Sequence, residues 1–253
     1  MKRFTIKNSK LQKIVFICFW LLLWEVAAKI IAKPVILPSV GQTVATLFGM
    51  LKHMDYYKAV LFSIVRVIAG VGLSILLGIV LGVLSGLFDV VYNFLKPVMS
   101  VIKSTPVVSF IILALVWMKT ATIPIFVCFL MCVPIIWTNV LQGIRETDKK
   151  LLDMCAVYKV PKRRVIKEIY IPSLRGYIYS SVAAAVGIGW KSMIAAEVIC
   201  KPNYAIGTGM YNAKIYLETT ELFALTLTVI VLSFIFEGLV KKLVERKRQE
   251  ALG

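Results

Sequence analysis

The feature that most constrains this chain is a series of apolar stretches, each roughly 20 residues long, that carry very little charge. About 20 helical residues are needed to cross the hydrocarbon core of a bilayer. Lipid leaves only helices and closed barrels as spanning structures, and these stretches lack the alternation of barrel strands. The sequence therefore predicts an all-α, polytopic membrane protein with about six transmembrane helices. We expect them at residues 14–32, 63–87, 98–118, 122–142, 177–199 and 222–240.

Composition excludes an ordinary soluble domain. Hydrophobic residues make up 59% of the chain and charged residues 17%, and the mean hydropathy is +0.84. A soluble domain carries about 25% charged residues. The formal net charge of +17 would suit nucleic acid, but the Lys and Arg residues cluster beside apolar runs, where they set topology and contact lipid headgroups. We expect a lipid bilayer around the protein and no nucleic-acid partner.

The distribution of basic residues predicts the topology. With six spans and the N-terminus inside, twenty Lys and Arg residues fall in cytoplasmic segments and six in external ones. Loops rich in Lys and Arg remain in the cytoplasm. We therefore expect a cytoplasmic basic N-terminus (1–13), a first span (14–32) and an external amphipathic segment (33–62). A core of five spans (63–240) follows, with a cytoplasmic loop at 145–176 and a cytoplasmic basic tail at 241–253.

Small residues recur at every fourth position of the second span, at Ser74, Gly78, Gly82 and Gly86. In lipid, such a stripe lets two helix backbones approach closely, so it predicts tight packing against a neighbouring helix. Cys128 and Cys132 lie one helical turn apart and could supply half of a metal site. No His or acidic residue in the same span completes such a site, so we expect packing residues and no bound metal.

One polar, basic stretch interrupts the apolar pattern: residues 151–172, LLDMCAVYKVPKRRVIKEIYIP. It predicts two short helices with a bend, because Pro161 suits the first turn of a second helix and Pro172 is expected to end it. Its apolar residues exceed what a solvated loop needs. The stretch is therefore either a projection that docks into a partner protein or a helix pair lying on anionic lipid.

The spacing within this stretch resembles the EAA loop of ABC importer permeases, whose pattern is E-A-A, three residues, G, nine residues and I-x-L-P. Asp153, Met154 and Cys155 occupy the first three places, followed by Ala156. Lys159 stands at the glycine place, where glycine would permit a positive φ. Ile169, Ile171 and Pro172 form the end of the pattern.

Other motifs resemble the nitrate/sulfonate/taurine branch of these permeases. Ser63, Arg66, Gly70, Gly78 and Gly82 fit the opening S-x-x-R-x-x-x-G…G-x-x-x-G of that branch. Its prolines and its N-x-x-x-G motif are matched by Pro106, Pro134, Asn139 and Gly143. The stretch 187–199, GIGWKSMIAAEVI, looks like its G-L-G-W…A-A-E motif.

The resemblance implies a type I ABC importer (MetI-like) permease fold in a bacterial inner membrane, and a transporter rather than an enzyme. It also implies partners: a second copy of the permease, two cytoplasmic ABC ATPase subunits that dock on the EAA loops, and an extracytoplasmic solute-binding protein. The chain contains no G-x-x-x-x-G-K-S/T stretch of the kind that cradles nucleotide phosphates. We therefore expect ATP-Mg on the partner ATPase and no cofactor on this chain.

Three residues of the fifth span are candidates for the substrate pathway. A bare ammonium in hydrocarbon costs at least ~2.5 kcal/mol, so Lys191 is expected to face water, a partner or the pore, or else to pair with an acid or snorkel to the interface. If it lines the pathway, it favours an anionic solute. Trp190 beside it either stacks on a flat solute or packs in the core. Glu197, six residues further on and on another face of the helix, has either a structural or gating role or a solute contact.

Several substrates and one other mechanism remain open. A small anion such as a sulfonate, taurine or nitrate fits Lys191, and the same machinery could carry a heterocycle resembling a thiamine precursor. A stand-alone secondary transporter would require inverted repeats and intramembrane acids for ion coupling. Glu25 and Glu237 are too scattered to serve that purpose, and no repeat is visible. A purely structural membrane protein would leave the EAA spacing unexplained.

Overall fold

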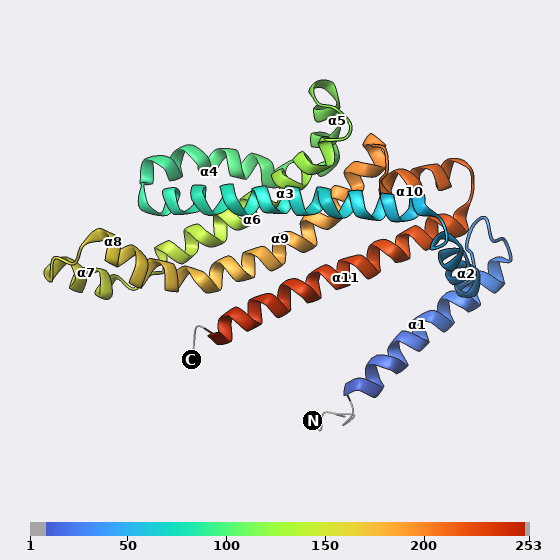
Figure 1. Ribbon diagram of the computed structural model, residues 1–253, viewed down its shortest axis with the longest axis horizontal. Coiled ribbons are helices and arrows are strands. Elements are labelled where there is room, and N and C mark those ends of the chain that lie inside the picture. Colours follow the sequence, from blue (N-terminus) through green and yellow to red (C-terminus); the bar gives the residue numbers. More distant parts are fainter. Residues whose placement is uncertain (1–8, 251–253) are drawn as a thin grey trace.

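The computed structural model describes residues 9–250, so most of the predicted basic N-terminus and the last residues of the tail lie outside the described residues. The described chain is built from helices without strands (Figure 1). The helices are α1 (Ser9–Ile31), α2 (Val40–Met50), α3 (Met54–Leu87), α4 (Asp89–Ser104), α5 (Val107–Trp117), α6 (Ile123–Arg145), α7 (Lys149–Val157), α8 (Lys162–Val165), α9 (Ile171–Cys200), α10 (Ile206–Ile215) and α11 (Thr219–Glu250). A π-helical segment, η1 (Ile166–Tyr170), joins α8 to α9.

Five helical segments among the described residues are long and apolar enough to cross a bilayer. They are Ile14–Ile31, Met54–Leu87, Ile123–Arg145, Lys162–Cys200 and Thr219–Lys242. Together α4 and α5 also reach that length, but they meet at an angle of 104° across a short break. The described residues therefore contain five candidate spans, or six if the bent pair counts as one. The all-α, polytopic fold predicted from the sequence is confirmed, with its third predicted span broken.

The small-residue stripe of α3 faces α6, and the two helices lie side by side (Figure 1). A Cβ built on Gly82 would lie 2.7 Å from Cβ of Val140, and one built on Gly78 would lie 2.8 Å from Cβ of Ile136. Contacts between Cβ atoms do not occur at such distances, so the helices approach this closely only because the side chains are absent. Ser74 donates its hydroxyl to the Phe129 carbonyl of α6, 3.1 Å away.

The core of the bundle is centred on α6 and α9. Cys128 and Cys132 of α6 are fully buried among apolar side chains from α3 and α9. The Cys132 thiol donates to the Ala185 carbonyl of α9 at 3.2 Å. Both thiols therefore fill space at a three-helix contact.

Two segments differ from the sequence expectation. The predicted second and third spans leave residues 88–97 between them, but residues 89–97 belong to α4, which contains Pro97 in its interior. Pro172 was expected to end a helix, but it lies in the first turn of α9, where proline is well tolerated. The π-helical turn η1 lies directly before it, and such a widened turn accommodates a proline ring. The chain from α8 into α9 is therefore continuous.

The first helix stands apart from the bundle in Figure 1 and joins it through α2. Trp24 donates its indole N–H to the Pro38 carbonyl at 3.0 Å, and Glu25 accepts the amide N–H of Val40 at 3.0 Å. Ser39 caps α2 through a reciprocal capping box with Gln42. Residues 14–23 of α1 are exposed and face lipid or another subunit, whereas Trp24 packs on Phe223 of α11, with ring centroids 5.6 Å apart.

Candidate functional site

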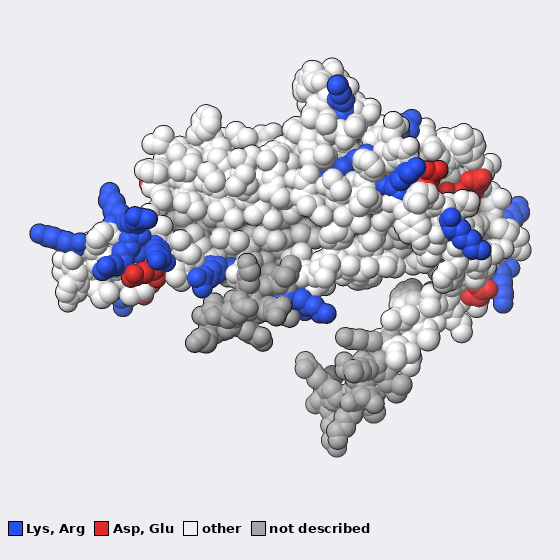
Figure 2. Space-filling view, in the orientation of Figure 1, with Lys and Arg blue, Asp and Glu red and all other residues white. Residues whose placement is uncertain are grey.

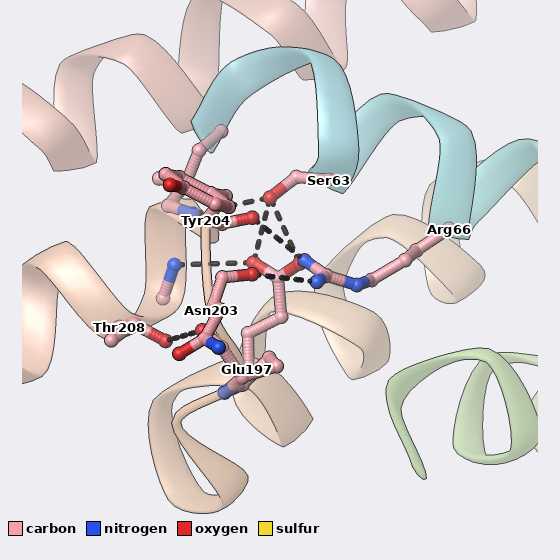
Figure 3. Close-up of polar contacts among 9 residues, drawn as sticks. Ser63, Arg66, Glu197, Asn203, Tyr204 and Thr208 are labelled. Carbon is pink, nitrogen blue, oxygen red and sulfur yellow. Dashed lines mark hydrogen bonds and ion pairs between the residues drawn. The ribbon is translucent and has the colours of Figure 1, made fainter. Parts of the chain in front are cut away.

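Three polar side chains from distant parts of the sequence meet at the end of the bundle opposite α7 (Figures 1 and 3). Arg66 Nη1 of α3 lies 2.8 Å from Glu197 Oε1 of α9, and the Ser63 hydroxyl of α3 lies 2.8 Å from both oxygens of the same carboxylate. The Glu197 side chain is 0% exposed. We call these three residues the Ser63–Arg66–Glu197 network.

The guanidinium of Arg66 also holds the loop that follows α9. It donates to the carbonyls of Asn203 at 2.9 Å and Tyr204 at 3.1 Å (Figure 3). Lys201 and Tyr204 adopt left-handed backbone conformations, with φ of 51° and 49°. Such conformations are unfavourable for residues with a β-carbon and persist where the surrounding bonds fix them. Arg66 supplies two of those bonds.

The first turn of α10 closes the network from the other side. The Gly207 amide donates to Glu197 Oε2 at 3.1 Å, and the Ile206 amide donates to the Ser63 hydroxyl at 3.1 Å. Gly207 has to be glycine, because a Cβ there would lie 2.5 Å from Cβ of Glu197.

Both oxygens of Glu197 and the hydroxyl of Ser63 are hydrogen-bonded within the chain, and Arg66 makes three hydrogen bonds there. Within the described residues, no buried side-chain nitrogen or oxygen lacks a partner. A buried ion pair is tolerated when its remaining donors and acceptors are bonded in this way. The network therefore ties α3, α9, α10 and the intervening loop into one unit, and it leaves the Glu197 carboxylate without a free face for a solute.

The other two predicted pathway residues have different environments. Trp190 is buried, its ring packs 5.4 Å from that of Phe236, and its N–H donates to the Val229 carbonyl at 3.2 Å. In this conformation its indole cannot stack on a solute. Lys191 is exposed, and no acidic side chain among the described residues forms an ion pair with it. Of the three predicted pathway residues, only Lys191 is exposed.

The residues predicted for the EAA loop lie at the opposite end of the bundle. Asp153, Met154 and Ala156 are exposed on α7, whereas Cys155 is buried at its base. Ile169 lies in η1, and Ile171 and Pro172 form the exposed start of α9. These seven residues, with Lys159 in the turn, therefore belong to one projection formed by α7, α8 and the start of α9, which we call the α7–α8 projection.

The turn between α7 and α8 explains why the EAA pattern has a glycine at the position of Lys159. Lys159 has φ of 51°, the left-handed conformation, directly after the helix ends. Its amide donates to the Ala156 carbonyl at 3.1 Å, and the Val160 amide donates to the Cys155 carbonyl at 2.9 Å. These two bonds form a Schellman motif, in which glycine is the usual left-handed residue. Here a lysine occupies that position.

One face of α7 is apolar and uncovered. Leu151, Met154 and Tyr158 lie three and four residues apart, so they share a face, and all three are exposed. Figure 2 shows Lys and Arg side chains gathered around the α7–α8 projection, while the surface over α3 and α4 is largely uncharged. The projection thus combines an apolar strip with basic surroundings.

The base of the projection is fixed where α6 crosses α9. Gly143 permits this crossing, since a Cβ there would lie 2.7 Å from Tyr177 Cδ2. The Tyr177 hydroxyl donates to the Glu146 carboxylate, and Gln142 donates to it at 2.7 Å. These hydrogen bonds hold the pKa of the Glu146 carboxyl below its usual range, and the bond from Tyr177 has the largest effect.

Sequence reasoning missed the pairing of Arg66 with Glu197. Both residues were noted as parts of separate motifs, and each is a charge in or beside a predicted span. The positions of the two residues within their predicted spans could have revealed the pairing. Arg66 lies just after the start of one span and Glu197 just before the end of another, which places both near the same side of the membrane. The loop carbonyls that complete the network have no sequence signature.

Comparison with known proteins gives a consistent family. Residues 74–249 match the family described as "Binding-protein-dependent transport system inner membrane component". A putative ABC transporter permease of Methanocaldococcus jannaschii is 24% identical over 190 residues, which cover 73% of this chain and 71% of that protein. The taurine transport system permease of Escherichia coli is 21% identical over 220 residues, 85% of this chain and 80% of that one. The nitrate import permease of Synechococcus elongatus is 31% identical over 120 residues, 47% of this chain and 43% of that permease, so this match spans less than half of either protein.

Proposed function

This chain belongs to the family of binding-protein-dependent transport system inner membrane components, the permeases of ABC importers, and we propose that it forms the path by which a small solute crosses the membrane. In this proposal an extracytoplasmic binding protein delivers the solute, and ATPase subunits on the cytoplasmic side drive its transfer. The chain lacks a phosphate-cradling G-x-x-x-x-G-K-S/T stretch, so ATP-Mg is assigned to the partner ATPase.

The observation that carries this proposal is the uncovered apolar face of the α7–α8 projection. An exposed strip formed by Leu151, Met154 and Tyr158 on a charged surface is typical of a protein interface. A helix with an apolar face commonly docks in a groove of its partner. We assign this face to the ATPase, with Asp153 and Lys159 at its polar edge.

Continuity between the projection and the bundle supports a coupling role. The chain runs from α8 through η1 into α9 without a loop, and α9 has 30 residues, a length of about 45 Å. Its far end carries Glu197, which is bonded to α3 and α10. A displacement of the projection by the ATPase would therefore reach the opposite end of the bundle through one rigid element.

A second copy of the permease completes the proposed path. In a single chain Lys191 and the bend between α4 and α5 are exposed, and neither a bare ammonium nor an irregular backbone suits direct contact with hydrocarbon. A second chain across these surfaces would enclose an aqueous path between the two subunits. Two permeases would then present two projections, one for each of two ATPase subunits.

The proposed substrate is a small anion. Two relatives are named for nitrate and taurine, a nitrogen oxyanion and a sulfonate. Lys191 supplies a positive charge without an internal acidic partner. A flat heterocycle would need an exposed aromatic surface, and the buried position of Trp190 does not favour it.

The docking role is tested with two matched tyrosines at opposite ends of the bundle. Tyr158 is 76% exposed on the projection, and Tyr216 is 74% exposed at the end of α10. The permease is co-expressed with an ABC ATPase from the same genome, and the amount of ATPase that co-purifies is measured. We expect Tyr158→Asp to reduce it at least about 10-fold, because a buried charge in an apolar contact is unfavourable. Tyr216→Asp should leave it unchanged. Unchanged ATPase binding in Tyr158→Asp and also in a Leu151→Asp/Met154→Asp double variant would contradict the docking role.

A further inference from the structure

A lysine to which the sequence motifs give no role, Lys103, lies in the last turn of α4, directly before the 104° bend. At about 1.5 Å per residue, Lys103 lies about 20 Å along α4. The hydrocarbon core is about 30 Å thick, so this position is deep in the membrane when α4 begins at its surface. An irregular backbone at such depth is tolerated only where it is buried in protein or lines water.

The ammonium of Lys103 has a neutral partner only. It donates to the Thr138 hydroxyl of α6 at 2.6 Å, and that hydroxyl donates in turn to the Pro134 carbonyl at 2.6 Å. No acidic side chain of the described chain forms an ion pair with Lys103, and its side chain is exposed. An ammonium has three donors. Two of them are therefore available to a ligand.

The neighbouring residues divide α4 into two faces near the bend. Ser100 lies one helical turn before Lys103 on the same face, and its side chain is exposed. On a different face, Phe94, Val98 and Val101 form an exposed apolar strip. The apolar strip suits lipid, whereas the face of Lys103 presents a hydroxyl group and a positive charge.

We propose that Lys103, held by Thr138 and joined by the hydroxyl of Ser100, forms an anion-binding site on the translocation path at the bend between α4 and α5. This proposal rests on the proposed function and adds a second positive site to Lys191. The ligand is a small oxyanion or sulfonate, whose oxygens accept hydrogen bonds from the ammonium and the Ser100 hydroxyl. The face of Lys103 turns toward the water-filled path, and the Val101 face turns away from it.

The first experiment measures uptake of isotope-labelled nitrate and taurine in proteoliposomes that hold the complete transporter. Lys103→Gln should lower uptake at low solute concentration at least about 10-fold, as expected for one charged hydrogen bond, mainly through a higher KM. Lys103→Arg should retain most of the uptake. Lys96→Gln, two turns earlier on the same helix, is the control and should transport like the wild type.

The possible outcomes distinguish failure of the Lys103 site from failure of the proposed function. Uptake by the wild type together with unchanged uptake by Lys103→Gln overturns the site alone. Loss of subunit assembly in Lys103→Gln, seen by size-exclusion chromatography, also overturns it, because Lys103 would then be a subunit contact. No uptake of either anion by the wild type would count against the proposed substrate class, and the second experiment then decides on Lys103.

The second experiment uses thiol accessibility and needs no substrate. Replacing the exposed Cys18 by serine leaves four cysteines, all buried. In this background Lys103→Cys and Val101→Cys are treated with a charged, membrane-impermeant thiol reagent. We expect the reagent to modify the Lys103→Cys variant at least about 10-fold faster than the Val101→Cys variant, since thiolates react only where water reaches them. Equal rates, or no reaction of the Lys103→Cys variant, would overturn the site.

Discussion

Lys159 adopts a backbone conformation that glycine adopts freely and lysine does not, with φ of 51°. The Schellman motif around it requires a left-handed residue at this point, whatever its side chain. The sequence pattern located the position where glycine would permit a positive φ, and the structure shows that lysine adopts it there. The α7–α8 projection thus retains its turn at an energetic cost.

Lys159→Gly is therefore expected to stabilise the projection. Removing the β-carbon relieves a left-handed strain of about 1 kcal/mol, partly offset by the greater freedom of glycine in the unfolded chain. Lys159→Ala is the control, because it removes the charge but retains the β-carbon. We expect slower proteolysis at the turn in Lys159→Gly, measured by limited digestion of the purified permease, and no protection in Lys159→Ala. Equal protection in both variants would attribute the effect to the charge.

The Ser63–Arg66–Glu197 network shows how much of a buried polar site can be predicted from residue types alone. A charge inside an apolar helix predicts a partner, and equal depth in two spans narrows the choice to Arg66 and Glu197. The fully buried position of Glu197 and its bond to the Gly207 amide depend on the path of the loop between α9 and α10. That path includes two left-handed residues with side chains, which no local preference predicts.

At the scale of helices, periodicity identified the packing face of α3 but not its partner. The fourfold spacing of small residues predicts close approach to some helix, and the structure assigns it to α6. The third span was predicted less accurately, because α4 begins before residue 98 and continues through Pro97, and the bend that follows it has no hydropathy signal. The π-helical turn before Pro172 was missed for a related reason, since proline was read as a stop.

The α3–α6 contact predicts a sharp difference between two glycines of the same helix. A Cβ on Gly82 would lie 2.7 Å from that of Val140, whereas a Cβ on Gly72 would meet nothing within 4 Å. Gly82→Ala is expected to destabilise the bundle by about 1–3 kcal/mol through overpacking. Gly72→Ala should be neutral or slightly stabilising, because alanine is the better helix former.

Buried thiols provide the measurement for this pair. Four of the five cysteines are buried and become reactive when the bundle unfolds, so a thiol-reactive fluorophore reports thermal unfolding in detergent. Gly82→Ala should lower the midpoint relative to wild type and Gly72→Ala should not. Equal midpoints for the two variants would show that the α3–α6 contact accommodates an added methyl group without loss of stability.

At the scale of the whole molecule, the two ends of the bundle have different chemistry. One end carries the α7–α8 projection with its basic side chains, and the other carries α2, α10 and the buried Ser63–Arg66–Glu197 network (Figures 1 and 2). Hydropathy and charge counting predicted this polarity without any structure. They did not predict that α1 stands apart from the bundle, because an apolar helix has the same composition whether lipid or protein surrounds it.

The polarity of the bundle leads to a prediction about its orientation. Basic loops remain in the cytoplasm, so the α7–α8 projection should be cytoplasmic and the start of α3 external. Val157 on α7 and Met54 at the start of α3 are both exposed and lie near opposite ends of the bundle, which makes them a matched pair. In a background with Cys18→Ser, the Met54→Cys variant should react with an impermeant maleimide in intact cells, whereas the Val157→Cys variant should react only after permeabilisation. The reverse pattern would place the projection outside the cell, where no ATPase could reach Tyr158, and would contradict the coupling role as well as the topology.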